Sequence, residues 1–164
     1  MNVSIDDIDA FVFDCDGVLT NNYVYQDENG IESVRFSRSD GLAFDALKKL
    51  KKPSFILSTE KNPVVTARAK KLNIEAIQGI GDKSKAIRKL AKNNNYALNK
   101  IIYVGNDIND YDVMLSVGMS ACPSDSHQMI KAISPIHLKS KGGEGIVREL
   151  LEKVFELNLK EILF

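Results

Sequence analysis

Two aspartates, Asp14 and Asp16, follow the apolar run AFVF and stand next to Gly17. Ionised carboxylates this close repel each other unless a proton or a cation lies between them. A hard, oxygen-ligated cation such as Mg²⁺ is the natural partner of such a pair. The alternative is a solvated turn acid with a helix cap beside it. We favour a site for chemistry or for an ion, because an apolar strand that ends in two acids cannot bury them comfortably.

Other polar groups come at comparable places along the chain. A hydroxyl pair, Ser58-Thr59, is followed by Glu60; Lys83 opens a helix-like segment; and residues 105–110 read GNDIND. Taken singly, each of these is common in turns and at helix ends. If they meet at one rim, they supply a nucleophile, a hydroxyl, a counter-charge and ligands for a divalent cation.

The elements that would position these groups alternate along the chain. Runs rich in Val, Ile and Phe predict strands over 8–13, 53–58, 74–77, 101–104 and 117–121, with a short sixth at 135–138 left open. Helical spacing of apolar residues predicts helices over 41–51, 63–72, 83–94, 108–116, 126–132 and 144–156. This alternation predicts an α/β fold, a Rossmann-like doubly wound parallel sheet. Ligands of such sheets collect at the carboxyl ends of the strands, where all the polar groups above would lie.

One segment, 22–37, breaks the alternation. It has two β-rich pieces around Asn29-Gly30, which is a strong hairpin signal, so we expect a β-hairpin inserted after the first strand. Its apolar side chains are Tyr23, Tyr25, Val34 and Phe36. A two-stranded ribbon is too small to be stable with these side chains in water, so we expect it to pack against a second subunit in a homo-oligomer.

Length and composition restrict the function. The 164 residues are most simply one domain, 1–164. Lys plus Arg and Asp plus Glu balance at 22 each, so no broad basic field predicts nucleic acid or an anionic membrane as a partner. The N-terminal residues carry no targeting pattern, and no apolar run is long enough for a membrane span, so we expect a cytoplasmic protein. Two cysteines make neither a disulfide framework nor a zinc site.

The four polar motifs, in their order, resemble those of the haloacid dehalogenase superfamily of phosphatases. They are DCDGVLT at 14–20, Ser58, Lys83 and GNDIND at 105–110. The length, the hairpin, TEKNPVV at 59–65, GDKSKA at 81–86 and KGGEG at 141–145 extend the resemblance. They are similar to members without a cap domain that cleave 3-deoxy-D-manno-octulosonate 8-phosphate or nonulosonate 9-phosphates. The chain is also similar to the C-terminal module of some CMP-sialate synthetases.

The resemblance implies a role for each motif residue. Asp14 would be the nucleophile that forms an aspartyl-phosphate, kept ionised by Mg²⁺ and Lys83, and Asp16 would be the general acid and then the base. Ser58 would bind a phosphoryl oxygen, and Lys83 would neutralise it. Mg²⁺ would be held by Asp14, the backbone carbonyl of Asp16, Asn106 and Asp107, with Asp110 as a brace or as a partner of Lys83. The residues expected to meet the sugar acid are Thr59, Glu60, Arg68, Lys71 and Arg35, with Ser39 and Asp40 near the hairpin exit as comparable candidates.

Asn106 departs from the family pattern, which most often has Asp at this metal-binding position. An amide oxygen can bind Mg²⁺ but adds no charge, so we expect weaker metal binding unless Asp107 replaces it. Because no cap domain is expected, neighbouring subunits of a tetramer would cover the site. The hairpin and the 139–144 loop are the segments expected to do so.

The sequence thus predicts an Mg²⁺-dependent phosphatase that hydrolyses the phosphomonoester of a 2-keto-3-deoxy sugar acid, in sialic acid or lipopolysaccharide biosynthesis. It does not decide between eight-carbon and nine-carbon acids. A two-component receiver domain uses similar residues, but the order of Ser58, Lys83 and the second acidic loop argues against it. A catalytically weak scaffold or oligomerisation module associated with a CMP-sialate synthetase stays open, and Asn106 is its best support.

Overall fold

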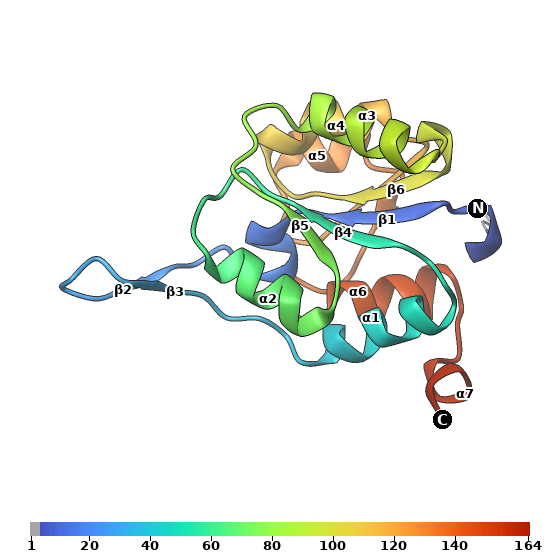
Figure 1. Ribbon diagram of the computed structural model, residues 1–164, viewed down its shortest axis with the longest axis horizontal. Helices are drawn as coiled ribbons and strands as arrows, with labels where there is room; N and C mark the ends of the chain where they lie inside the picture. The colour runs from blue at the N-terminus through green and yellow to red at the C-terminus, as the bar shows by residue number, and fades with distance from the viewer. Residues whose placement is uncertain (1–3) are drawn as a thin grey trace.

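A six-stranded parallel sheet forms the middle layer of the molecule, with the strands in the order β5-β4-β1-β6-β7-β8 (Figure 1). The computed structural model describes residues 4–164. The strands are β1 Ala10–Phe13, β4 Ser54–Leu57, β5 Glu75–Ile77, β6 Ile101–Val104, β7 Met119–Cys122 and β8 Ile136–His137. All six predicted strands are confirmed, including the short one that the sequence left open. The first strand pairs with β4 on one side and β6 on the other, which puts its carboxyl end at the centre of the sheet.

Helices connect the strands and cover both faces of the sheet. They are α1 Ser39–Lys49, α2 Val64–Leu72, α3 Lys83–Asn94, α4 Tyr111–Ser116, α5 Gln128–Ile133, α6 Ile146–Glu149 and α7 Leu159–Leu163. Figure 1 shows α1, α2 and α6 below the sheet and α3, α4 and α5 above it. The doubly wound α/β fold without a cap is therefore confirmed over residues 4–164. The predicted helix 108–116 is divided into a 3₁₀ turn, Ile108–Asp110, and α4, because Asp110 turns its side chain inward.

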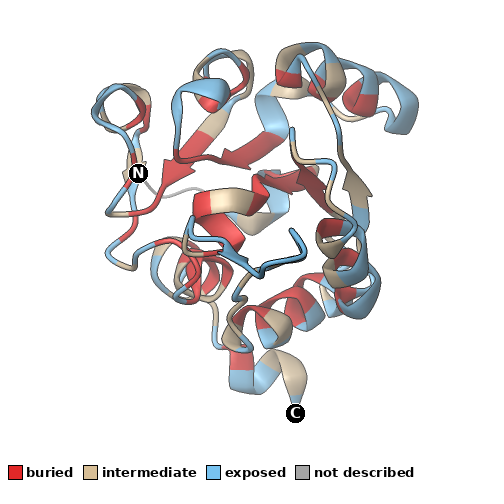
Figure 2. Ribbon diagram, turned by 90° about the vertical axis from the view of Figure 1, so that its left-hand side faces the viewer, coloured by how far each residue is buried: buried red, intermediate tan, exposed pale blue. Residues whose placement is uncertain are grey.

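The core lies in two layers, one on each face of the sheet. Successive strand residues point to opposite faces, so Phe11 and Phe13 join the layer under α1, while Ala10 and Val12 join the layer under α3 and α4. Phe13 meets Phe44 of α1 edge to face, with ring centroids 5.3 Å apart. Figure 2 shows these strands as the buried centre of the molecule. This packing holds the end of β1, and with it Asp14, in a fixed place.

The predicted hairpin is present, formed by β2 Tyr25–Gln26 and β3 Glu32–Ser33. It extends away from the body of the molecule, on the side where β1 ends (Figure 1). Tyr23, Tyr25 and Ile31 are 71%, 60% and 67% exposed. Phe36 is different, because it bridges to Thr20 and lies under the guanidinium of Arg68. The expectation that Phe36 shares the exposed apolar surface was therefore wrong, since the chain has already returned to the body there.

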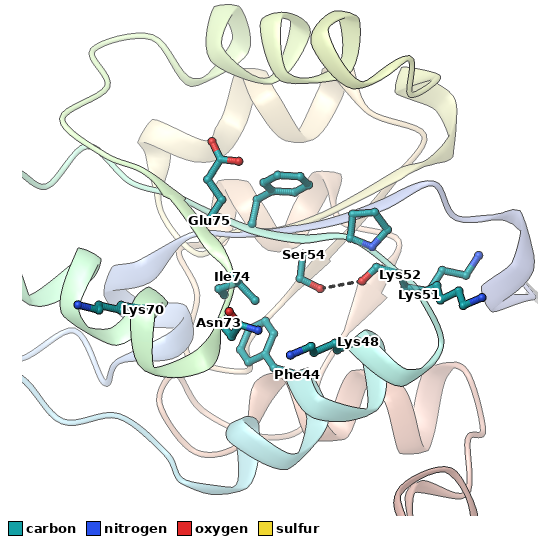
Figure 3. A pocket seen from close by; sticks show the side chains of 11 residues that line it. Phe44, Lys48, Lys51, Lys52, Ser54, Lys70, Asn73, Ile74 and Glu75 are labelled. Atoms are coloured by element: carbon teal, nitrogen blue, oxygen red, sulfur yellow. Dashed lines mark hydrogen bonds between the residues drawn. The ribbon is translucent and has the colours of Figure 1, made fainter.

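The amino edge of the sheet carries a hollow of about 550 Å³ at the starts of β4 and β5 (Figure 3). Lysines surround it: Lys48, Lys51, Lys52 and Lys70. The Nζ of Lys52 donates to the carbonyl of Ile8 at 3.0 Å. The heads of Lys48, Lys51 and Lys70 make no ion pair with any residue in 4–164. Within the same range, no helix is both long and apolar enough to cross a membrane.

Candidate active site

Three charged side chains meet at the carboxyl edge of the sheet. The Nζ of Lys83 lies 2.8 Å from Oδ1 of Asp14 and 2.6 Å from Oδ1 of Asp110. Asp14 ends β1, Lys83 is the first residue of α3, and Asp110 follows β6. All three are nearly fully buried, at 4%, 4% and 0% exposure. The structure thus brings together two predicted acids and the predicted lysine, with Asp110 paired to Lys83.

Asp110 organises the loop after β6. Its Oδ2 accepts hydrogen bonds from the backbone N–H groups of Asn106, at 2.9 Å, and Asp107, at 3.3 Å. Its Oδ1 also accepts from the hydroxyl of Tyr103 at 2.7 Å. We did not predict Tyr103 as part of the site. The available signal was its hydroxyl within the otherwise apolar strand IIYV, because a buried phenol needs a hydrogen-bond partner.

The electrostatic balance of this cluster is not neutral, because two carboxylates share one ammonium group. Burial, followed by repulsion from Asp110, raises the pKa of Asp14 to about 8, and these effects outweigh the attraction of Lys83. Burial by itself would lower the pKa of Lys83, but Asp14 and Asp110 raise it above its ordinary value. The attraction of Lys83 alone therefore does not offset the effect of burial and of Asp110 on the pKa of Asp14. A further positive charge beside Asp14 would do so.

Asp16 lies in the turn Cys15–Leu19 that follows Asp14. The hydroxyl of Thr20 donates to its Oδ1 at 3.4 Å, and Gly17 next to it has a φ of 78°, which favours glycine. Burial raises the pKa of Asp16, and the negative charge of Glu60 adds to the effect. A raised pKa favours the protonated form of the carboxyl group, which is the form that a general acid needs.

Asn106 comes very close to this turn. A Cβ placed on Gly17 would lie 1.9 Å from Nδ2 of Asn106, so only glycine lets the two loops meet. Oδ1 of Asn106 is buried and has no hydrogen-bond partner within residues 4–164. A buried acceptor without a partner is costly unless something binds it. No three His, Cys, Asp or Glu side chains in that range cluster as a metal site, so a cation here would need this amide oxygen together with Asp14.

Ser58 follows β4 at the same edge, is 1% exposed, and accepts a hydrogen bond from the N–H of Glu60 at 3.1 Å. Its own hydroxyl hydrogen stays free to donate. Thr59 is exposed, and together with the start of α3 and Ile108 it lines a hollow of about 580 Å³ beside Lys83. Glu60 accepts hydrogen bonds from the N–H groups of Lys61 and Asn62.

The remaining predicted residues are spread more widely. Asp107 is exposed, and its Oδ1 accepts from the N–H of Ile108 at 2.7 Å. Arg68 donates a hydrogen bond to the carbonyl of Ser37, at 2.7 Å, and its guanidinium lies over the ring of Phe36. Lys71 and Arg35 lie on α2 and just after the hairpin. The proposed roles of these four in binding metal or sugar stay predictions.

This fold and this cluster define a class: doubly wound α/β proteins with an aspartate pair at the end of the first strand and a lysine beside it. The family model for haloacid dehalogenase-like hydrolases matches residues 17–150. The chain therefore belongs to the haloacid dehalogenase-like hydrolase family, as its motifs predicted.

Individual relatives carry more specific names than the family does. 3-Deoxy-D-manno-octulosonate 8-phosphate phosphatase KdsC of Escherichia coli (strain K12) is 29% identical over 90% of this chain and 79% of its own length. A HAD family protein of Streptomyces avermitilis has a TM-score of 0.90 and 37% identity, covering 93% of this chain and 87% of that one. The octulosonate 8-phosphate phosphatase of Moraxella catarrhalis, solved with magnesium, phosphate and KDO, has a TM-score of 0.88 and 29% identity over 93% and 88%. The expected enzyme class, a phosphoric monoester hydrolase, is confirmed.

Proposed function

We propose that the protein is an Mg²⁺-dependent phosphatase that hydrolyses a phosphomonoester of a 2-keto-3-deoxy sugar acid through an aspartyl-phosphate. The observation that carries this proposal is the buried cluster at the end of β1. There, Oδ1 of Asp14 lies 2.8 Å from Nζ of Lys83, and Oδ1 of Asn106 has no partner among the described residues. The magnesium and phosphate ions bound to the Moraxella enzyme support the same chemistry.

The residues of the chain divide the work between two steps. An oxygen of Asp14 attacks phosphorus, the bond from phosphorus to the sugar oxygen breaks, and the carboxyl group of Asp16 gives its proton to that oxygen. Asp16, now a carboxylate, takes a proton from a water molecule, which attacks phosphorus, restores Asp14 and releases phosphate. Its raised pKa suits the first role. Ser58 donates to a phosphoryl oxygen, and Lys83 offsets the negative charge.

Asp14, the backbone carbonyl of Asp16 and Oδ1 of Asn106 would hold Mg²⁺, with Asp107 as a further candidate. The ion would supply positive charge that favours the ionised form of Asp14 and that stabilises the transferring phosphoryl group. Its fit rests on the unpartnered oxygen of Asn106 and on the raised pKa of Asp14. Asp110 acts behind these residues by holding Lys83 and the backbone of the loop.

The substrate class rests on the relatives, which are named for the octulosonate 8-phosphate. The residues proposed to meet the sugar acid are Thr59, Glu60, Arg68, Lys71 and Arg35. A nine-carbon acid phosphate is the alternative that the motifs leave open. We also propose that the chain is one domain, 1–164, in a cytoplasmic homo-oligomer, which the resemblance suggests is a tetramer. The exposed Tyr23, Tyr25 and Ile31 of the hairpin support a contact between subunits.

A second candidate is the weak scaffold or oligomerisation module of a CMP-sialate synthetase. The neutral Asn106 favours it, since one charge is missing from the cation site. The buried acids argue the other way, because a scaffold would be more stable without Asp14 and Asp110 crowded around one lysine.

The test is phosphate release, with and without Mg²⁺, from octulosonate 8-phosphate, N-acetylneuraminate 9-phosphate, the deaminated nonulosonate 9-phosphate and hexose phosphates. Asp14→Asn serves as the blank. A strong, Mg²⁺-dependent preference for one sugar acid is the expected result. If a folded protein releases phosphate from none of them, the scaffold alternative gains support, and Asn106→Asp then tests whether the missing charge is the reason.

A further inference from the structure

A buried carboxylate outside the cluster, that of Asp40, joins two helices. Asp40 is the second residue of α1, directly after the hairpin segment, and is 1% exposed. Its Oδ1 accepts from the backbone N–H of Val147 at 2.9 Å and of Arg148 at 3.2 Å. Both donors belong to the first turn of α6, so Asp40 caps a helix that lies more than a hundred residues later in the chain.

This cap is costly. Oδ2 of Asp40 is buried and finds no hydrogen-bond partner among residues 4–164. The cations that face it, Arg68 on α2 and Arg148 on α6, do not form an ion pair with it within the described chain. Burial therefore raises the pKa of Asp40 to about 6, in spite of the two N–H donors. A neutral Asn or Ser would cap the same N–H groups without burying a charge, so stability alone does not account for a carboxylate at this position.

The start of α6 continues the loop that touches the aspartate turn. The N–H of Gly143 donates to the carbonyl of Val18 at 2.9 Å. A Cβ on Gly142 would lie 2.3 Å from the carbonyl oxygen of Gly17, so the two backbones are in direct contact. Gly145, with a φ of 92°, in turn lies against Ser39, the neighbour of Asp40. One connected set of contacts thus runs from Asp40 through the start of α6 and the Gly142–Gly143 backbone to the turn that carries Asp16.

We propose that Asp40 is a positioning residue for the phosphatase reaction: by holding the start of α6, it keeps the Gly142–Gly143 backbone against the turn and so keeps Asp16 in place. This inference rests on the proposed function. Asp40 touches neither Asp14 nor Lys83, and it acts only through backbone contacts. A carboxylate accepts hydrogen bonds from two N–H groups more strongly than a neutral acceptor does, so the charge of Asp40 holds the start of α6 more firmly.

The role of Asp16 as proton donor gives the experiment its selectivity. A sugar alkoxide leaves only if it receives a proton, whereas a nitrophenolate leaves without one. We therefore compare kcat/KM for the best sugar-acid phosphate with kcat/KM for p-nitrophenyl phosphate, since kcat/KM reports the step in which the leaving group departs. Asp40→Ala is expected to lower the first by about tenfold or more and the second by less than about threefold.

Three further variants separate positioning from folding. Asp40→Asn keeps the shape of the side chain and one weaker acceptor, so it is expected to fold. It should also lose more kcat/KM on the sugar-acid phosphate than on p-nitrophenyl phosphate, by a smaller factor than Asp40→Ala. Asp45→Ala and Asp45→Asn, on the exposed face of the same helix, are the matched controls and should leave both substrates unchanged. Amide hydrogen exchange at Gly143 should be faster in the Asp40 variants than in the Asp45 variants, because its bond to Val18 opens more often.

Equal losses on both substrates, or unchanged exchange at Gly143 beside lost activity, would overturn the positioning role. So would normal selectivity in a folded Asp40→Asn protein whose Asp40→Ala counterpart does not fold. A wild-type protein that cleaves no sugar-acid phosphate removes the proposed function itself, and the role of Asp40 falls with it. The two failures are distinguished by the wild-type measurement alone.

Discussion

The two edges of the sheet carry charge in opposite ways. At the carboxyl edge, Asp14, Lys83 and Asp110 are nearly fully buried, and both carboxylates lie within 2.8 Å of the lysine ammonium. At the amino edge, Lys48 and Lys70 lie beside the hollow of Figure 3 and pair with no carboxylate within 4–164. Charges interact several times more strongly at a low-dielectric site than in water. The charges at the carboxyl edge are therefore buried and paired with one another, while Lys48 and Lys70 at the amino edge have no carboxylate partner among the described residues.

The largest expected effect is that of Asp14→Asn. The variant should lose phosphatase activity by more than about 10³-fold, because the attacking oxygen is gone. It should keep its stability, because Lys83 stays paired with Asp110 at 2.6 Å and an amide at position 14 removes the repulsion between the two carboxylates. Phosphate release and urea unfolding measured on one preparation test both parts.

A contaminating phosphatase is controlled by following the loss of Mg²⁺-dependent activity rather than total activity. If Asp14→Asn retains that activity, the aspartyl-phosphate mechanism is wrong. If the free energy of unfolding of Asp14→Asn is much lower than that of wild type, then Asp14 stabilises the fold, and its repulsion from Asp110 does not dominate in the cluster.

Lys83→Met should affect both activity and folding. It leaves Asp14 and Asp110 buried without a cation, which costs about 3–5 kcal/mol for a broken buried pair. The matched variant at the amino edge, Lys48→Met, should change the free energy of unfolding by less than about 0.5 kcal/mol. Denaturant unfolding of the two proteins sharpens the comparison. Equal effects of the two substitutions would mean that burial does not distinguish the two edges.

Much of this arrangement could be predicted from the sequence, because it depends on local patterns. The apolar runs located the six strands, and Asn29-Gly30 located the hairpin. The topology of a parallel sheet brings its strand ends together, so Asp14, Ser58 and the 105–110 loop were expected to meet. The pairing of Lys83 with Asp110 was one of the two roles expected for Asp110.

The rest depends on contacts that no local pattern contains. Tyr103 looked like one more strand residue until its hydroxyl met Asp110. Asp40 was a candidate for meeting the substrate, yet the N–H groups that it binds come from Val147 and Arg148. Arg68 shares a helix with Lys71, and both were expected to meet the substrate. The guanidinium of Arg68 lies over the ring of Phe36, at the point where the chain returns from the hairpin to the body of the molecule.

The third prediction concerns pH. Because the pKa of Asp40 is raised from 3.8 to about 6 by burial, the folded protein holds a proton there that the unfolded chain has lost. This group therefore contributes stability below about pH 4 that is lost as the pH rises through about 6, a change of up to about 3 kcal/mol. Asp40→Asn lacks this contribution. The free energy of unfolding of wild type minus that of Asp40→Asn should fall by that amount between pH 4 and pH 7, and a constant difference would show that Asp40 is not buried as a charge.

The smallest effect is expected at the amino edge. Lys48→Glu and Lys70→Glu reverse charges that lie on α1 and α2, at the opposite end of the strands from Asp14. Water and salt screen such charges over about 10 Å, so the field at the active site should hardly change. We expect kcat/KM for the best substrate to stay within about twofold and the free energy of unfolding within about 0.5 kcal/mol of wild type. Steady-state kinetics at low and at high salt provide the test. A drop in activity that high salt abolishes would show that the lysines attract an anionic substrate over a long distance. A drop that salt leaves unchanged would mean that a change at the amino edge alters the structure of the active site through the strands.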